Sequence, residues 1–322
     1  MKFTHIAVYS TFLNKYKVVI QMELQGILPL NKPKGMTSHD CVAKLRGILK
    51  TRKIGHTGTL DPEVTGVLPI CIGKATKVAQ YMSDYSKTYE CEVTIGFSTT
   101  TEDFTGEIID EKPVKELVTM KQLKEVVNSF VGEIEQIPPM YSAVKVNGKK
   151  LYEYARLGQV VERPSRRVVI HNLTILTEPE LFDGNKLKFS FRVHCSKGTY
   201  VRTLAVDIGK QLGYPSHMSA LVRTASGPFT LKECITFEQI ESMFKVGELQ
   251  QKLFNFEDAL SFLKHIEVND NLAFKISNGA VLPFPEGIAE NRFTVYNKNG
   301  ECLAIYQKHP TKAGLMKPEK VF

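Results

Sequence analysis

The chain has 322 residues, of which 43% are hydrophobic and 24% are charged, and its formal net charge is +8 at pH 7. A chain of this length and composition can bury the cores of two domains. It contains no run of about twenty apolar residues, which argues against a membrane span. Its six scattered cysteines lack a Cys-x-x-Cys pair, so we expect reduced thiols in a cytoplasmic protein.

The positive charge is concentrated in two segments. Residues 32–53 and 137–167 each carry seven Lys or Arg, and their net charges are +6 and +5, whereas the remaining 269 residues net −3. Clustered positive charge is typical of a surface that binds a phosphate backbone. A solvated helix face is the alternative for either segment taken alone.

In chain order, residues 1–21 precede a second methionine, Met22, and lack the apolar core and small-residue cleavage site of a signal peptide. We interpret them as a leader outside the fold. A short apolar strand over 26–30 enters a turn rich in chain-breaking residues. Ser38 is then the expected N-cap of a helix that extends to about Lys50.

The loop Gly55-His56-Thr57-Gly58-Thr59-Leu60-Asp61-Pro62 places one carboxylate in a segment of restricted geometry. Gly55 and Gly58 permit backbone conformations that other residues resist, and Pro62 fixes the chain directly after the acid. Reactive groups are often carried on loops held by a rigid scaffold. A turn capped by an aspartate is the simpler interpretation of Asp-Pro, so a catalytic role for Asp61 needs support from the rest of the chain.

The middle of the chain alternates between helical and strand periodicity. Helices are expected near 76–85 and over 115–131, and strands over 88–97, 167–176 and 188–195. Strands with one polar face indicate antiparallel pairing. The sequence therefore predicts an α+β fold, with a mixed, largely antiparallel sheet flanked by helices and loops.

After residue 245 the sequence pattern indicates a separate, β-rich segment. Expected strands at 293–296 and 303–306 flank Asn299-Gly300, a dipeptide typical of a tight hairpin. We therefore predict a larger domain over 22–245 and a small β-rich domain over 246–322.

Motifs for common cofactors are missing from the sequence. No His or Cys spacing is typical of a metal site, Gly73-Lys74-Ala75 does not complete a phosphate-binding loop, and no Gly-x-Gly-x-x-Gly opens a helix after a strand. No local motif marks an activated Ser or Cys. We expect no metal and no cofactor, which leaves Asp, Tyr and Arg side chains as candidates.

Residues 195–207 present an aromatic ring and a guanidinium together. Gly198 ends a strand, and Tyr200 and Arg202, two positions apart, would share one face of an extended chain before a helix begins. Such a pair can stack on a base and hold a carboxylate. A core tyrosine beside a surface arginine is the alternative.

From Met22 onward, the chain resembles the TruB-type tRNA pseudouridine-55 synthases over nearly its whole length. The matching blocks occur in the family's order, and Asn31 departs from the family's more usual aspartate before Lys-Pro. The blocks are residues 26–28 and 32–38, 55–62 and 65–69, 73–77, 87–89, 136–145 (QIPPMYSAVK), 195–204 (CSKGTYVRTL) and 221–224.

The resemblance implies a pseudouridine synthase fold and a monomeric enzyme that acts on uridine 55 in the T arm of tRNA. Uracil would be detached from its ribose, turned and rejoined through C5, which requires no cofactor. The basic segment 137–167 matches the mobile loop that folds over the RNA, and residues 246–322 look like a PUA-type RNA-binding domain. The target base must be flipped out of the folded arm to be reached.

The resemblance also implies site residues. Asp61 aligns with the catalytic aspartate, Arg202 would favour its charged form, and Tyr89 aligns with the tyrosine that stacks on the flipped base. The implied substrate-binding residues are His56, which fills the gap in the RNA stack, Lys77, Tyr200, Leu221 and Lys32.

Two functions of other classes remain open from the residues themselves. A tRNA-binding or tRNA-folding protein could do without catalysis, although intact Asp61, Tyr89 and Arg202 argue against lost activity. A retaining glycosidase would need two carboxylates about 5 Å apart. Asp207 is the only nearby motif carboxylate, and its place on a helix after Arg202 favours a structural role.

Overall fold

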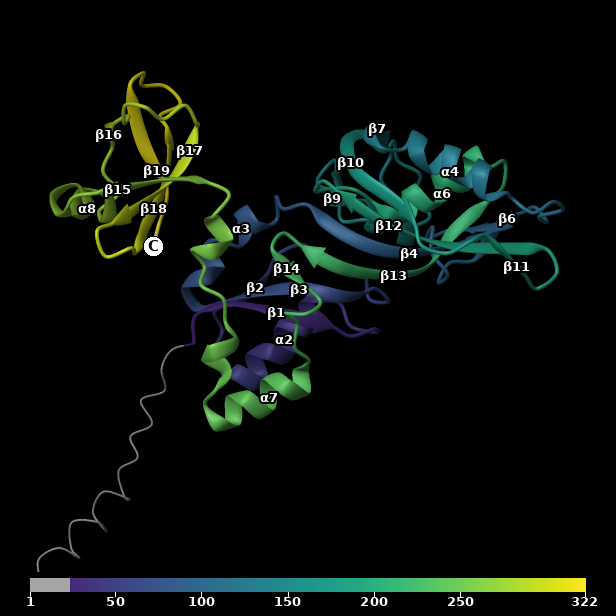
Figure 1. Ribbon diagram of the computed structural model, residues 1–322, viewed down its shortest axis with the longest axis horizontal. Helices are drawn as coiled ribbons and strands as arrows, with labels where there is room; N and C mark the ends of the chain where they lie inside the picture. The colour runs from purple at the N-terminus through teal and green to yellow at the C-terminus, as the bar shows by residue number, and fades with distance from the viewer. Residues whose placement is uncertain (1–23) are drawn as a thin grey trace, which may run out of the picture.

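A computed structural model describes residues 24–322, so the expected leader over 1–21 lies outside the described residues. The described chain forms a ten-stranded sheet and, towards the C-terminus, a five-stranded sheet. Figure 1 shows the two sheets as separate lobes. Among the strand pairs of the large sheet, β3 with β13 is parallel and the others are antiparallel. The predicted α+β fold with a mixed, largely antiparallel sheet is confirmed.

The large sheet has a main path of seven strands and three short branches. The main path is β1 (Gly26–Lys32), β3 (Thr65–Ile72), β13 (Ser216–Ser226), β4 (Lys87–Ile95), β12 (Lys186–Cys195), β10 (Arg166–Ile175) and β7 (Gly132–Gln136). The branches are β2 (Ile54–His56), β11 (Glu180–Phe182) and β14 (Phe229–Thr230), and two separate hairpins pair β5 (Phe97–Thr99) with β6 (Ile108–Glu111) and β8 (Lys145–Val146) with β9 (Lys149–Lys150).

Helices cover the large sheet and complete its core. They are α2 (Ser38–Leu49), α3 (Ala79–Met82), α4 (Met120–Ser129), α5 (Leu151–Arg156), α6 (Val201–Gln211) and α7 (Phe237–Val246). Helix α6 packs on β13, α4 packs on β10, and α2 packs against α7. The central strand β4 buries Cys91, Val93 and Ile95, as its alternating pattern predicts.

The helix after the first turn begins one residue earlier than expected. Thr37, not Ser38, is the N-cap, and its side chain accepts from the backbone N–H of Asp40. Threonine and aspartate at these positions form a complete capping box, which sequence spacing alone did not distinguish. Ser38 is instead buried, and its Oγ accepts from the Leu60 N–H at 2.9 Å. The start of α2 is thereby tied to the loop that carries Asp61.

Several predicted elements differ from the structure. The helix expected near 76–85 is a short 3₁₀ helix (Gly73–Lys77) followed by the single turn of α3, and the helix expected over 115–131 is limited to α4. Strand β13 was not predicted. Its pairing with β4 is interrupted by two register shifts, which break the clean alternation that marks a strand in sequence.

The C-terminal lobe is built on the predicted hairpin. Strands β17 (Arg292–Asn297) and β18 (Cys302–Lys308) pair antiparallel across Asn299-Gly300, which confirms that prediction. The lobe also contains β15 (Lys264–Val268), β16 (Leu282–Pro283), β19 (Leu315–Val321) and α8 (Asp270–Ser277), preceded by 3₁₀ helices at Leu249–Lys252 and Asp258–Leu260.

The two lobes share a hydrophobic contact. One buried cluster joins Ile27 and Val67 of the large sheet to Leu260 in the connecting segment and to Ile305 on β18. Burial of apolar side chains from both lobes stabilises this contact.

Candidate active site

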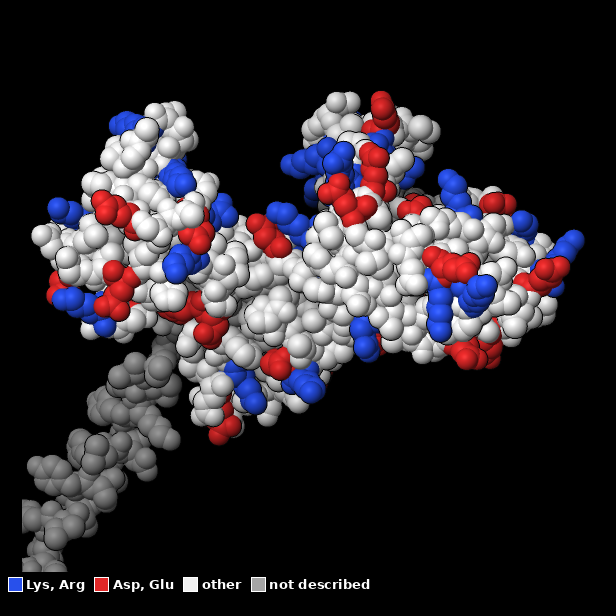
Figure 2. Space-filling view, turned by 45° about the horizontal axis from the view of Figure 1, so that its top comes forward, with Lys and Arg blue, Asp and Glu red and all other residues white. Residues whose placement is uncertain are grey.

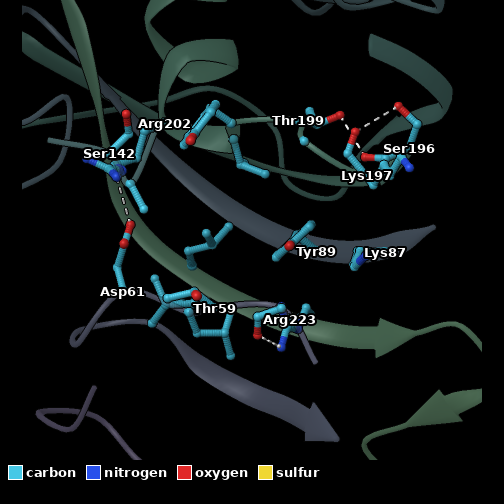
Figure 3. A pocket seen from close by; sticks show the side chains of 18 of the residues that line it. Thr59, Asp61, Lys87, Tyr89, Ser142, Ser196, Lys197, Thr199, Arg202 and Arg223 are labelled. Carbon is cyan, nitrogen blue, oxygen red and sulfur yellow. Dashed lines mark hydrogen bonds and ion pairs between the residues drawn. The ribbon is translucent and has the colours of Figure 1, made fainter. Parts of the chain in front are cut away.

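A cavity of about 320 Å³ lies where the Asp61 loop faces the centre of the large sheet. Its floor comes from β4 and β13, and its walls come from residues 58–64, 142–143 and 196–202. Figure 3 shows Asp61 and Arg202 at one end of the cavity, Tyr89 and Arg223 in the middle, and Lys87 beyond them. Asp61 is the only carboxylate among the described residues that line the cavity.

Asp61 and Arg202 form an ion pair, with 3.0 Å between Asp61 Oδ2 and Arg202 Nη2. The Arg202 side chain is only 6% exposed, whereas that of Asp61 is 43% exposed. Arg202 also donates from Nη1 to the carbonyl of Thr101 and from Nη2 to the carbonyl of Tyr141, both at 2.9 Å. The guanidinium is therefore fixed from three directions, and the partner carboxylate is held towards the cavity.

The backbone around Tyr200 and Arg202 differs from the extended chain expected there. Helix α6 starts at Val201, so Arg202 lies in its first turn while Tyr200 remains the extended N-cap residue. The amide of Gln136 bonds both the N–H and the carbonyl of Tyr200, and the Arg166 guanidinium lies 5.5 Å from the Tyr200 ring centroid. Both predicted side chains line the cavity, but they reach it from the N-cap and the first turn of a helix and not from one extended segment.

Lys32 binds the backbone of the Asp61 loop through hydrogen bonds. Its side chain is fully buried, and Nζ donates to the carbonyls of Pro33, Pro62 and Val64 at 2.7–2.9 Å. Burial lowers the pKa of Lys32. Since its three donors are occupied by loop carbonyls, the described structure gives Lys32 a positioning role, and it does not line the cavity as the predicted substrate contact would.

Tyr89 and Leu221 lie on the floor of the cavity. In the β4–β13 ladder, Tyr89 is directly opposite Arg223 and Leu221 is opposite Cys91. Burial raises the pKa of the Tyr89 phenol, while the nearby charge of Arg223 opposes that rise. The cavity therefore offers a tyrosine ring and a branched aliphatic side chain beside the carboxylate.

Two predicted residues lie away from the cavity wall. His56, on β2, has its ring centroid 5.1 Å from that of His39, and burial lowers its pKa, so the neutral imidazole is favoured. Lys77 donates to the carbonyl of Val321 at 3.1 Å, which places it at the junction of the two lobes. Neither residue is among those that line the cavity.

Sequence reasoning missed two cations in the cavity. Lys87 is 7% exposed and Arg223 is 1% exposed, and both lie on the cavity floor with Tyr89. They occur in the sequence blocks 87–89 and 221–224, but burial of a lysine or arginine is unusual enough that sequence favours the surface for each. Only the pairing of β4 with β13 brings them together.

The basic segment 137–167 leads into the cavity at its N-terminal end. Ser142 and Ala143 line the cavity, while Lys149 and Arg156 further along are exposed or partly exposed on β9 and α5. Figure 2 shows Lys and Arg side chains gathered near β9, on the part of the larger lobe that faces the C-terminal lobe. Segment 137–167 therefore connects the cavity to a positively charged part of the surface.

Metal and membrane signals are limited in the described part of the chain. Within residues 24–322, no group of three or more His, Cys, Asp or Glu side chains is arranged to hold a metal ion. Every helix in that range is too short or too polar to span a bilayer.

Family models match most of the described chain. The model of the TruB family pseudouridylate synthase N-terminal domain matches residues 46–201, and that of the tRNA pseudouridylate synthase B C-terminal domain matches residues 202–261. A curated protein named tRNA pseudouridine synthase B from Bacillus pumilus is 57% identical over 302 residues, covering 92% of this chain and 97% of that protein. A protein of the same name from Halalkalibacterium halodurans is 58% identical over 300 residues, covering 93% and 98%.

Solved structures extend the likeness to the fold. A chain in the crystal structure of a Cbf5-Nop10-Gar1 complex matches with a TM-score of 0.69 and 28% identity, over 94% of this chain and 86% of that chain. A chain in the structure of an H/ACA RNP bound to a substrate RNA containing 2′-deoxyuridine matches with a TM-score of 0.69 and 26% identity, over 96% and 88%. With relatives this similar over nearly its full length, the chain belongs to the TruB family of pseudouridylate synthases.

Proposed function

We propose that this enzyme converts uridine 55 in the T arm of tRNA to pseudouridine, with Asp61 as the essential catalytic carboxylate. The observation that carries the proposal is the ion pair of Asp61 with the buried Arg202, at one end of a cavity that no other carboxylate lines among the described residues. A single carboxylate also disfavours a retaining glycosidase, because that reaction needs two. The curated relatives named tRNA pseudouridine synthase B support tRNA as the substrate.

The target uridine enters the cavity as a flipped base. A volume of about 320 Å³ is within the range of small-ligand pockets, and the ring of Tyr89 is available for stacking. The carboxylate then attacks the sugar, adds to the base or removes a ribose proton, and it acts as an anion in each route. Arg202 orients that anion, and Tyr200 and Leu221 form the walls beside the base.

The rest of the molecule holds the RNA. His56 fills the space that the flipped base leaves in the stack, Lys77 contacts the phosphate backbone, and segment 137–167 closes over the T arm. Residues 22–245 act as the catalytic domain and residues 246–322 as a PUA-like RNA-binding domain. We further propose that the enzyme is a monomer in the cytoplasm, where the tRNA named by its curated relatives is modified.

The test is site-resolved detection of pseudouridine in tRNA transcripts incubated with the enzyme. Pseudouridine is expected at position 55 and at no other position, both in the full tRNA and in the isolated T-arm hairpin. A transcript with cytidine at position 55 is the control and should remain unmodified. Modification spread over other uridines, or none at position 55, would contradict the assignment of the substrate.

A further inference from the structure

Lys87 and Arg223 form a pair of buried cations on the floor of the cavity, on either side of Tyr89 and away from the Asp61 carboxylate (Figure 3). Both flank Gly58, because a side-chain carbon built on Gly58 would lie 3.7 Å from Arg223 Nη1 and 3.9 Å from Lys87 Cε. Lys87 Nζ donates to the carbonyls of Ser83 and Tyr85 at 2.7 and 2.6 Å. Arg223 Nε donates to the carbonyl of Val67 at 2.7 Å.

The buried cation pair has no carboxylate partner within residues 24–322, where neither Lys87 nor Arg223 forms an ion pair. Asp84, the carboxylate whose charge acts on Lys87, is itself bound by Lys197 at 2.7 Å. Burial first, and then the charge of Arg223, lower the pKa of Lys87 to about 8. Two positive charges are therefore held largely out of water, with backbone carbonyls and the Tyr89 phenol beside them.

An unpaired buried charge is costly, so this arrangement destabilises the free enzyme. Arg202 avoids that cost through its ion pair with Asp61. The cost at Lys87 and Arg223 is offset when a negative charge arises in the cavity, because attraction between charges is strong where water is excluded. The cation pair is thus preorganised for an anion that appears during the reaction.

The reaction proposed above generates such an anion on the base. When the C1′–N1 bond breaks, its electron pair goes to uracil, and the negative charge spreads over N1, O2 and O4. After the base turns, C5 bonds to C1′, the C5 proton leaves, and N1 takes up a proton, so the uridine is isomerised without oxidant or reductant. Addition of Asp61 to the base would also place negative charge on a ring carbonyl.

We propose, resting on the proposed function, that Lys87 and Arg223 stabilise the negative charge that develops on the detached uracil. Tyr89 lies directly opposite Arg223 in the β4–β13 ladder. A base stacked on Tyr89 with its ribose towards Asp61 directs its ring carbonyls towards the cation pair. The two parts of the cavity then act on the two fragments: Asp61 on the ribose side of the broken bond, and the cations on the base.

The experiment compares T-arm hairpins that carry uridine or 5-fluorouridine at the target position, in single-turnover reactions that follow consumption of the target nucleoside. Fluorine makes the base more acidic, so its anion needs less stabilisation. Arg223→Gln should slow reaction of uridine on the order of 10²-fold, and reaction of 5-fluorouridine clearly less. Arg223→Lys retains the charge and should recover most of the uridine rate.

Arg192→Gln is the matched control, because Arg192 lies on the same sheet but is exposed and paired with Glu90. It should change neither rate. Lys87→Gln provides a second test if Arg223→Gln does not fold. Equal slowing of both substrates, or a rise in KM alone as expected for a phosphate contact, would overturn the inference. Failure of the wild-type enzyme to convert uridine would instead contradict the proposed function.

Discussion

Two parts of the cavity use positive charge in opposite ways. At one end, Arg202 is paired with Asp61 and bonded to two carbonyls, so its charge is compensated and its geometry is fixed. Away from Asp61, on either side of Tyr89, Lys87 and Arg223 are more deeply buried than Asp61 and have no carboxylate partner in residues 24–322. A paired cation positions a reacting group. An unpaired buried cation instead stabilises a negative charge that develops only during the reaction.

Replacing Arg202 removes the ion pair with Asp61. Arg202→Gln leaves Asp61 without its partner and two carbonyls without their charged donor, so conversion of a T-arm hairpin should slow on the order of 10²–10³-fold. Single-turnover pseudouridine formation measures the effect. Arg202→Lys, which keeps the charge but not the three-way geometry, should be intermediate. A variant rate within twofold of wild type would show that the pair does not position the carboxylate.

The unpaired cations predict opposite effects of pH on rate and stability. Loss of the Lys87 proton above about pH 8 should lower the rate of conversion, roughly tenfold per pH unit at most. Between about pH 8 and the ordinary Lys pKa of 10.5, the unfolded chain binds more protons than the folded chain. The free energy of unfolding of wild type should therefore rise with pH relative to Lys87→Gln.

Rates and chemical denaturation of both proteins from pH 7 to 10.5 provide the measurement. A wild-type rate that is flat through pH 9, or a difference in unfolding free energy that falls with pH, would argue against a buried Lys87 cation.

The contribution of Lys32 to the stability of the Asp61 loop can be measured separately from catalysis. Lys32→Met leaves three loop carbonyls without a donor and should lower the free energy of unfolding by about 1–3 kcal/mol. Lys34→Met is the matched control, because that side chain is 63% exposed and pairs with Glu63 at the surface. Equal denaturation midpoints for the two variants would exclude a positioning role for Lys32.

The smallest effects are expected outside the cavity. Lys149→Gln, on the exposed surface of segment 137–167, should weaken tRNA binding slightly and reduce the salt dependence of the affinity by about one phosphate contact. The single-turnover rate at saturating enzyme should be unchanged. Filter-binding titrations over a range of salt concentrations test this, and an unchanged salt slope would remove Lys149 from the RNA surface.

Local sequence predicted the features that depend on local chemistry. The glycines and Pro62 around Asp61, the hairpin at Asn299-Gly300 and the alternation of β4 each have a short-range cause, and the structure contains all three features. The N-cap at Thr37 was misassigned by one residue, because Ser38 is an equally good capping residue by type. The catalytic role of Asp61 and the domain boundary near 246 stay predictions.

Features that depend on pairing between segments far apart in the chain could not be predicted from the sequence. Lys87 and Arg223 are joined only by the β4–β13 ladder, and β13 itself was hidden by its register shifts. Burial of Lys32 against backbone carbonyls leaves no sequence signal, so its positioning role could not be predicted, and its assignment to the substrate, implied by the family resemblance, stays a prediction. Tyr200 and Arg202 line one cavity, but the start of α6 between them differs from the extended chain that the sequence predicted.

The most direct test of the account is Asp61→Asn, assayed for pseudouridine at position 55 of tRNA and for tRNA binding in parallel. The substitution keeps the shape of the side chain and removes its charge, so conversion should fall below detection while the affinity for tRNA stays within a few fold of wild type. Asp84→Asn, an exposed aspartate paired with Lys197, should retain conversion. Full conversion by Asp61→Asn would contradict the central claim.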